Sequence, residues 1–262
     1  MNIDTHIDRA RTRVRDEQAA VDAKIDAFDA FAGRIEDVST APTPTTSTGV
    51  TTAAGMQPCV TAAADSRCRQ VRTAFAETIC PHSVDDPDDG GSLLTTIREE
   101  FTETIAVALA PTTEASFTPE LKRAIVTETK ARRAEAAALD RALDRETKQI
   151  HAAGDVVDEI TGWIVRSDEP PLSAIGFNAL RLRYETLEDH RARCEALARR
   201  RQAFFERTTN NGIEAGIRHR RLVPYLYNAL PVDHPVLAAA AQLDSACREY
   251  QRAVCDHLTR RG

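Results

Sequence analysis

The residues best suited to chemistry lie in one short stretch, CVTAAADSRCRQVRTAFAETICPH, residues 59–82. Thiolate and imidazole groups bind Zn²⁺, but zinc sites usually pair their ligands about two to four residues apart. Here eight residues separate Cys59 from Cys68, and eleven separate Cys68 from Cys80. On a helix, Cys68 and Cys80 would lie about 18 Å apart along the axis. We therefore predict a helix with sulfur in its core, with a convergence of Cys59, Cys80 and His82 as the open alternative.

Recognisable catalytic motifs are missing from the sequence. It contains no C-x-x-C redox pair, no H-E-x-x-H or G-x-S-x-G motif, and no glycine-rich phosphate-binding or dinucleotide-binding pattern. The aspartates of residues 85–89 lack the spacing of an EF-hand calcium loop. We therefore predict a protein that is not an enzyme and that has no catalytic residues, no cofactor and no metal.

Two arginine clusters form the candidate binding site. They are Arg199, Arg200 and Arg201, and Arg218, Arg220 and Arg221. Guanidinium groups can hold phosphates, and residues 173–262 carry 15 arginines against 10 acidic residues, a net charge of +5. Residues 1–172 carry 19 basic and 30 acidic residues, a net charge of −11 that would repel DNA. The clusters are predicted contacts for a nucleic acid or a partner, against the alternative of a solvated helix surface.

The composition of the chain predicts a helical protein of the cytoplasm. Only 11 of 262 residues are glycine, while alanine, glutamate and arginine are abundant, which favours helix. The sequence contains no run of about 18 apolar residues, the length that a membrane-spanning helix needs. The N-terminus also lacks the apolar segment of a secretory signal. Only four of the 34 basic residues are lysine, which suggests a halophilic source.

Two heptad patterns predict long helices. In residues 3–38, apolar residues recur every seven positions, and a second row is interrupted by Glu17 and Lys24. From Leu139 to Ile164, apolar residues alternate at steps of four and three, with Glu146 as one polar position. Such stripes need a partner helix, in the same chain or in another one. They therefore predict helix packing within the chain, self-association or a protein partner.

Shorter patterns complete the prediction of an all-α fold, an elongated bundle with long coiled-coil-like helices. Further helices are expected at about 60–80, 93–109, 119–166, 174–208 and 235–260. The break SDEPP between two long helices predicts an antiparallel helical hairpin. The predicted domains are an N-terminal coiled-coil-like helix at 1–38, a flexible Thr/Pro-rich linker at 39–58, and a helical bundle domain at 59–262.

The segments QVRTAFAETICPHS (residues 70–83) and YLYNALPVDHPVLAAAAQLDSACREYQRAVCDHLTR (residues 225–260) resemble a family of haloarchaeal proteins. The family is known only as a domain of unknown function, and the resemblance spans most of the chain. It implies an all-helical fold in a halophilic archaeon. It supplies no established activity and no catalytic residues.

Heptad stripes without site chemistry are typical of proteins that bind other proteins. The leading prediction is a non-enzymatic helical scaffold or adaptor, which binds another protein or itself. The alternative is a DNA-associated regulatory protein that uses the basic C-terminal half of the chain.

Overall fold

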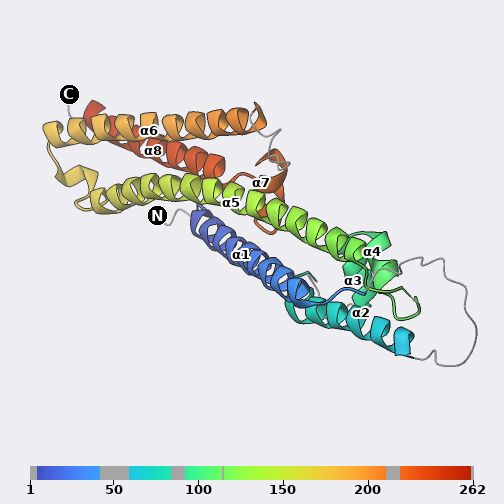
Figure 1. Ribbon diagram of the computed structural model, residues 1–262. Helices are drawn as coiled ribbons and strands as arrows, with labels where there is room; N and C mark the ends of the chain where they lie inside the picture. The colour runs from blue at the N-terminus through green and yellow to red at the C-terminus, as the bar shows by residue number, and fades with distance from the viewer. Residues whose placement is uncertain (1–4, 42–58, 84–91, 114, 211–218, 261–262) are drawn as a thin grey trace, which may run out of the picture. The chain divides into compact units, whose positions relative to one another are not determined.

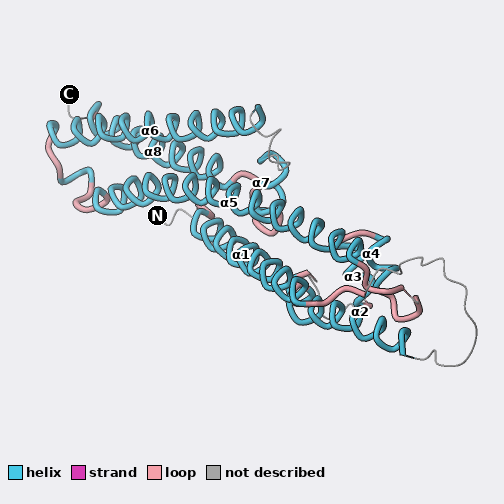
Figure 2. Tube along the Cα trace, viewed as in Figure 1, coloured by secondary structure: helices cyan, strands magenta, loops and turns pink. Residues whose placement is uncertain are grey.

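The computed structural model describes residues 5–41, 59–83, 92–113, 115–210 and 219–260. Within these ranges every regular element is a helix, so the predicted all-α fold is confirmed (Figures 1 and 2). The α-helices are α1 (Ile7–Asp37), α2 (Cys59–Thr78), α3 (Leu93–Glu100), α4 (Glu103–Leu109), α5 (Pro119–Ser167), α6 (Phe177–Asn210), α7 (His219–Tyr227) and α8 (Pro235–Thr259). Two short 3₁₀ helices are η1 (Cys80–His82) and η2 (Leu172–Ala174).

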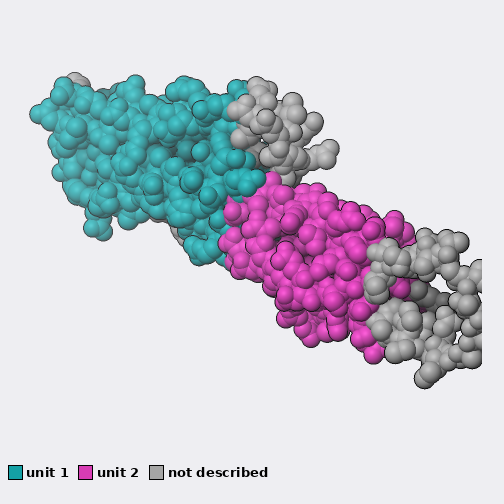
Figure 3. Space-filling model, in the orientation of Figure 1, with its two compact units in different colours: residues 1–18, 141–262 teal, residues 19–140 magenta. Residues whose placement is uncertain are grey.

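The chain divides into two compact units, coloured separately in Figure 3. One contains residues 1–18 and 141–262, and the other contains residues 19–140. Both boundaries fall inside long helices, α1 and α5. The sequence-based division followed composition, which does not reveal which helices pack together. Residues 42–58 of the predicted linker lie outside the described residues.

The heptad stripe of α1 is buried within the chain. Its first row is at most 7% exposed along the whole helix, at Ile7, Val14, Val21, Phe28 and Ile35. The stripe on α5 is buried in the same way, because seven of its eight heptad positions from Leu143 to Ile164 are buried and only Leu139 is half-buried. The apolar stripes of α1 and α5 are therefore covered by other parts of this chain.

Three phenylalanines form the centre of the unit at residues 19–140. Phe31 from α1, Phe75 from α2 and Phe101 from the α3–α4 junction have ring centroids 5.5–5.9 Å apart. Two of the three pairs are edge-to-face, an arrangement that aromatic rings favour. All three side chains are buried, so this cluster joins three segments that are distant in sequence.

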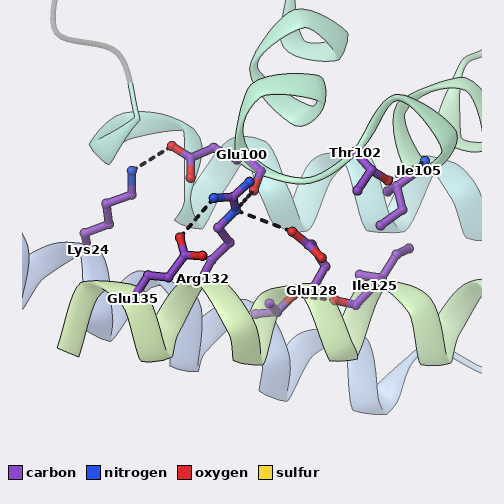
Figure 4. A network of polar contacts seen from close by, with 9 residues as sticks. Lys24, Glu100, Thr102, Ile105, Ile125, Glu128, Arg132 and Glu135 are labelled. Carbon is purple, nitrogen blue, oxygen red and sulfur yellow. Dashed lines mark hydrogen bonds and ion pairs between the residues drawn. The ribbon is translucent and has the colours of Figure 1, made fainter. Parts of the chain in front are cut away.

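The predicted single helix at 93–109 was wrong, because the chain breaks after Glu100. Thr102 caps α4 by accepting a hydrogen bond from the Ile105 amide at 3.3 Å. Arg132 of α5 donates to the Glu100 carbonyl at 2.6 Å, which satisfies a backbone acceptor left free at the end of α3 (Figure 4). Lys24, one of the polar heptad positions, pairs with the Glu100 carboxylate at 2.7 Å.

Helices α5, α6 and α8 form the body of the other unit (Figure 1). Contacts between α5 and α6 run from Trp163–His190 near the connecting loop to Glu146–Arg201 far from it. This order fits an antiparallel hairpin, in agreement with the prediction. Helix α8 packs against both. The Tyr250 ring centroid lies 6.2 Å from that of Trp163 on α5, and the Tyr250 hydroxyl accepts a hydrogen bond from Arg183 of α6 at 3.2 Å.

Candidate functional site

The six predicted arginines do not share one environment. Arg199 and Arg200 are exposed on α6, and Arg199 pairs with Glu195 one turn earlier. Arg201 is buried, and its side chain is 1% exposed. Arg218 lies outside the described residues, and the side chains of Arg220 and Arg221 also lie outside them, although their backbone belongs to α7.

Arg201 is held by a buried polar network. Its guanidinium donates two hydrogen bonds to the Glu146 carboxylate, at 2.9 and 2.7 Å. The Tyr227 hydroxyl donates to the same carboxylate at 2.7 Å, and burial followed by the Glu146 charge raises the pKa of Tyr227. The Arg201 guanidinium also lies 4.4 Å from the ring centroid of Phe205. This arginine therefore holds α5, α6 and α7 together, and it does not contribute to a surface patch.

Heptad spacing contains a signal for this arrangement that the sequence analysis missed. Leu180, Leu187, Cys194 and Arg201 are spaced by seven residues along α6, and all four are buried. Arg201 therefore occupies a core position, as Glu146 does on α5. Two polar residues at core heptad positions of neighbouring antiparallel helices are candidates for pairing.

An open groove of about 630 Å³ lies between α6 and α8. Half of its lining residues are small or apolar, among them Ala192, Ala198, Leu237 and Ala241. Ala192 and Ala241 are exposed, so the groove is open to solvent along both helices. Small side chains between two packed helices allow a third helix to approach closely.

Charged groups border this groove. Arg191 and Arg248 both pair with Asp244, at 2.9 and 2.8 Å, which leaves these three groups with a net charge of +1. Glu188 and Glu195 line the α6 side of the groove and are exposed. Glu195 is already paired with Arg199, so Glu188 is the acidic group on the α6 edge that has no described ion pair and could meet a basic side chain of a partner.

Two cysteines lie in the α6–α8 packing interface and are poor nucleophiles. Cys194 and Cys247 are 1% and 0% exposed. Burial, with Asp244 adding to it, raises the pKa of Cys194 to about 11. Burial and the neighbouring Cys194 raise the pKa of Cys247 to about 12. Both thiols stay protonated near neutral pH, so they act here as small core side chains.

The stretch at residues 59–82 forms the predicted helix. Cys68 is buried, as expected for its position on the apolar face, while Cys80 is half-buried and His82 is exposed on η1. The Cys59 side chain lies outside the described residues. Among the residues that were described, no group of three or more His, Cys, Asp or Glu side chains could hold a metal ion.

His190 is a buried imidazole without a polar partner. It is 5% exposed, and neither ring nitrogen makes a hydrogen bond within the described part of the chain. Trp163 of α5 packs edge-on against it at 4.9 Å between ring centroids. Burial lowers the pKa of His190, the Arg193 charge lowers it further, and Glu159 and Asp189 oppose the shift.

Stability is expected to fall as the pH drops below about 6.5, the ordinary histidine value. The unfolded chain then takes up a proton that buried His190 resists, at a slope of up to about 1.4 kcal/mol per pH unit. Urea unfolding followed by Trp163 fluorescence from pH 7.5 to 5 would measure the slope. His190→Phe should flatten it, whereas the exposed His151→Gln should keep it. Equal slopes in wild type and His190→Phe would contradict this assignment.

Comparisons with known proteins place the chain in a family without assigning an activity. None of the helices in the described ranges is long and apolar enough to cross a membrane. No curated protein and no solved structure matches the chain. A family described as "Domain of unknown function (DUF7260)" matches residues 5–251. Since this match covers nearly the whole sequence, the chain belongs to the DUF7260 family.

Proposed function

We propose that this protein is a non-enzymatic helical scaffold or adaptor that binds a helix of another protein. The observation that carries the proposal is the open groove of about 630 Å³ between α6 and α8. Helix-in-groove binding is a recurrent mode of peptide recognition, and it uses a small, apolar lining with charged edges. Between Glu188 and Gln202, the lining residues of α6 span about 21 Å along the axis, the length of a four-turn helix.

The occupant is a helix from a different protein. A second copy of this chain would need a free apolar helix face, and the heptad stripes of α1 and α5 are already buried. Among the side chains that the structure describes, the large apolar ones that are exposed are scattered, at Val107, Val165, Phe177, Leu182 and Tyr225. The partner helix would present small apolar residues to the groove and a basic residue to Glu188.

Contacts on α6 do not favour the DNA-binding alternative. Arg201 is committed to Glu146, and Arg199 is paired with Glu195 on the edge of the groove. Of the three arginines in this cluster, only Arg200 is exposed without a described ion pair. A single exposed arginine between acidic residues gives little of the counterion release on which DNA affinity depends.

The proposal also locates the protein in the cytoplasm of a haloarchaeon. This part rests on the composition, with four lysines among 34 basic residues, and on the resemblance of residues 225–260 to haloarchaeal proteins. Fractionation of the source cells tests it, and recovery of the chain in the membrane fraction would contradict it.

The groove is tested by crosslinking followed by binding. A photoreactive amino acid at position 241 should crosslink one protein in source cells, and mass spectrometry would give the attached segment. A synthetic peptide of that segment should bind the wild type, and Ala241→Arg, which fills the groove, should weaken binding about thirtyfold. Ala179→Arg, at an exposed α6 position outside the groove, serves as the matched control.

The outcomes of this experiment separate the candidate occupants. Loss of peptide binding in Ala241→Arg alone supports the proposal. Equal binding by both variants, crosslinking to a second copy, or crosslinking to nucleic acid would each refute it. Circular dichroism of both variants checks that the helices are intact.

A further inference from the structure

A small cavity between α1 and α5 gathers cationic and hydrogen-bond-donating side chains. It has a volume of about 200 Å³ and lies entirely within the unit of residues 1–18 and 141–262. Arg11, Arg15 and Gln18 line it from α1, with Thr147 and His151 from α5, and Val14 and Ile150 complete the lining. No carboxylate lines this cavity, although the chain as a whole carries a net charge of −6.

An anion bound between Arg11 and Arg15 would offset the repulsion between their positive charges. Arg11 and Arg15 are four residues apart on one helix, a spacing at which like charges repel. The Nε atom of Arg11 is buried and makes no hydrogen bond within the described part of the chain. Its Nη1 atom contacts Asp8 at 3.1 Å and Asp158 at 3.8 Å, but those carboxylates are 92% and 69% exposed and compensate it only weakly.

Gly154 of α5 has no side chain, and the Arg11 guanidinium occupies the space that a side chain there would fill. A Cβ atom at position 154 would lie 1.7 Å from Arg11 Nη2 and 2.3 Å from its Cζ. The guanidinium therefore rests directly on the backbone of α5, and a side chain at position 154 would have to displace it. Glycine in the middle of a helix costs about 0.5–1 kcal/mol relative to alanine, so this packing is maintained against helix propensity.

We propose that this cavity binds a small oxyanion of the phosphate class. Arg11 and Arg15 can donate hydrogen bonds to such an anion, and His151 can do so through a ring N–H. Gln18 and Thr147 are already engaged, because Gln18 donates to Asp144 at 3.1 Å and Thr147 donates to Gln18 at 3.5 Å. A volume of about 200 Å³ is below the range of about 300–1,000 Å³ typical of sites for larger organic ligands. The ligand is therefore free phosphate or the phosphate group of a small monoester, and not a nucleotide.

The test is isothermal titration of the full chain with inorganic phosphate and, separately, with glycerol 3-phosphate, at constant ionic strength set by chloride. Saturable binding of either one is expected. Arg15→Gln should weaken it about tenfold, since one charge-assisted hydrogen bond is lost. Arg145→Gln, an exposed arginine outside the cavity, makes the same charge change and should bind as the wild type does.

Gly154→Ala provides a second test that removes no donor. The added methyl group displaces Arg11 and should also weaken binding about tenfold. Gly162→Ala on the same helix is the control, because its Cβ would meet only the end of the Arg166 side chain, at 3.2 Å. Circular dichroism and thermal unfolding in chloride check that each variant folds.

The two ligands divide the outcomes. Tighter binding of glycerol 3-phosphate assigns the cavity to a monoester, and equal or weaker binding assigns it to free phosphate. The proposal fails if neither ligand binds saturably. It also fails if Arg145→Gln or Gly162→Ala weakens binding as much as Arg15→Gln and Gly154→Ala do, because the effect would then be general electrostatics or altered stability.

Discussion

Replacing Glu146 with leucine is expected to lower the free energy of unfolding by about 3–5 kcal/mol, because it leaves a buried arginine without its partner. Arg201 is 1% exposed, and both of its hydrogen bonds to Glu146 would be lost. The Tyr227 hydroxyl would lose its acceptor as well. Urea unfolding followed by the fluorescence of Trp163, the single tryptophan, which lies in the same unit, measures the change.

The double variant Glu146→Leu with Arg201→Met is the decisive control. Replacing both members of a buried ion pair by apolar residues of similar size is often neutral, so most of the lost stability should return. Tyr227→Phe should cost only about 1 kcal/mol, the net value of one hydrogen bond. A double variant as unstable as Glu146→Leu would show that packing, and not the unpaired charge, causes the loss.

Phe75→Ala is the second substitution with a large expected effect, a loss of about 3–5 kcal/mol in the unit at residues 19–140. Phe75 is 0% exposed and contacts both Phe31 and Phe101, so alanine would leave a cavity between three segments. Urea unfolding followed by circular dichroism at 222 nm would detect the loss as an earlier transition.

Two further variants isolate the cause of that loss. Phe75→Leu fills most of the volume and should lose less, chiefly the aromatic contacts, worth about 0.5–1.5 kcal/mol per pair. Glu77 lies on α2, as Phe75 does, and forms an exposed ion pair with Arg34 of α1. Glu77→Ala should therefore change stability by less than about 0.5 kcal/mol. If Phe75→Ala cost no more than Glu77→Ala, the aromatic cluster would not be the centre of this unit.

Periodicity in the sequence predicted most of the helices, because a buried stripe leaves a local signature. The helix start near residue 119 was predicted, and in the structure the Thr118 hydroxyl caps α5 by accepting a hydrogen bond from the Leu121 amide at 3.2 Å. The break between α3 and α4 was missed, because the apolar stripe continues through it. That break is stabilised by Arg132, more than thirty positions further along the chain, and no local pattern contains such a contact.

The candidate site shows the same limit. Arg201 was grouped with Arg199 and Arg200 because the three are consecutive, although neighbours on a helix point about 100° apart. Its heptad relation to Leu187 and Cys194 could have placed it in the core. The α6–α8 groove could not be predicted, since its alanines become a surface feature only when two helices distant in sequence lie together.

The polar residues at heptad positions also determine which alignment of the helices is correct. A repeat of similar apolar residues distinguishes poorly between alignments that differ by seven positions, because each alignment buries similar side chains. Such a shift of α6 would place Cys194 opposite Glu146 and leave both Glu146 and Arg201 buried without a partner. The Glu146–Arg201 pair therefore determines the register of the hairpin. The apolar positions stabilise the packing of the two helices, and the ion pair selects one alignment among several that would bury similar apolar surfaces.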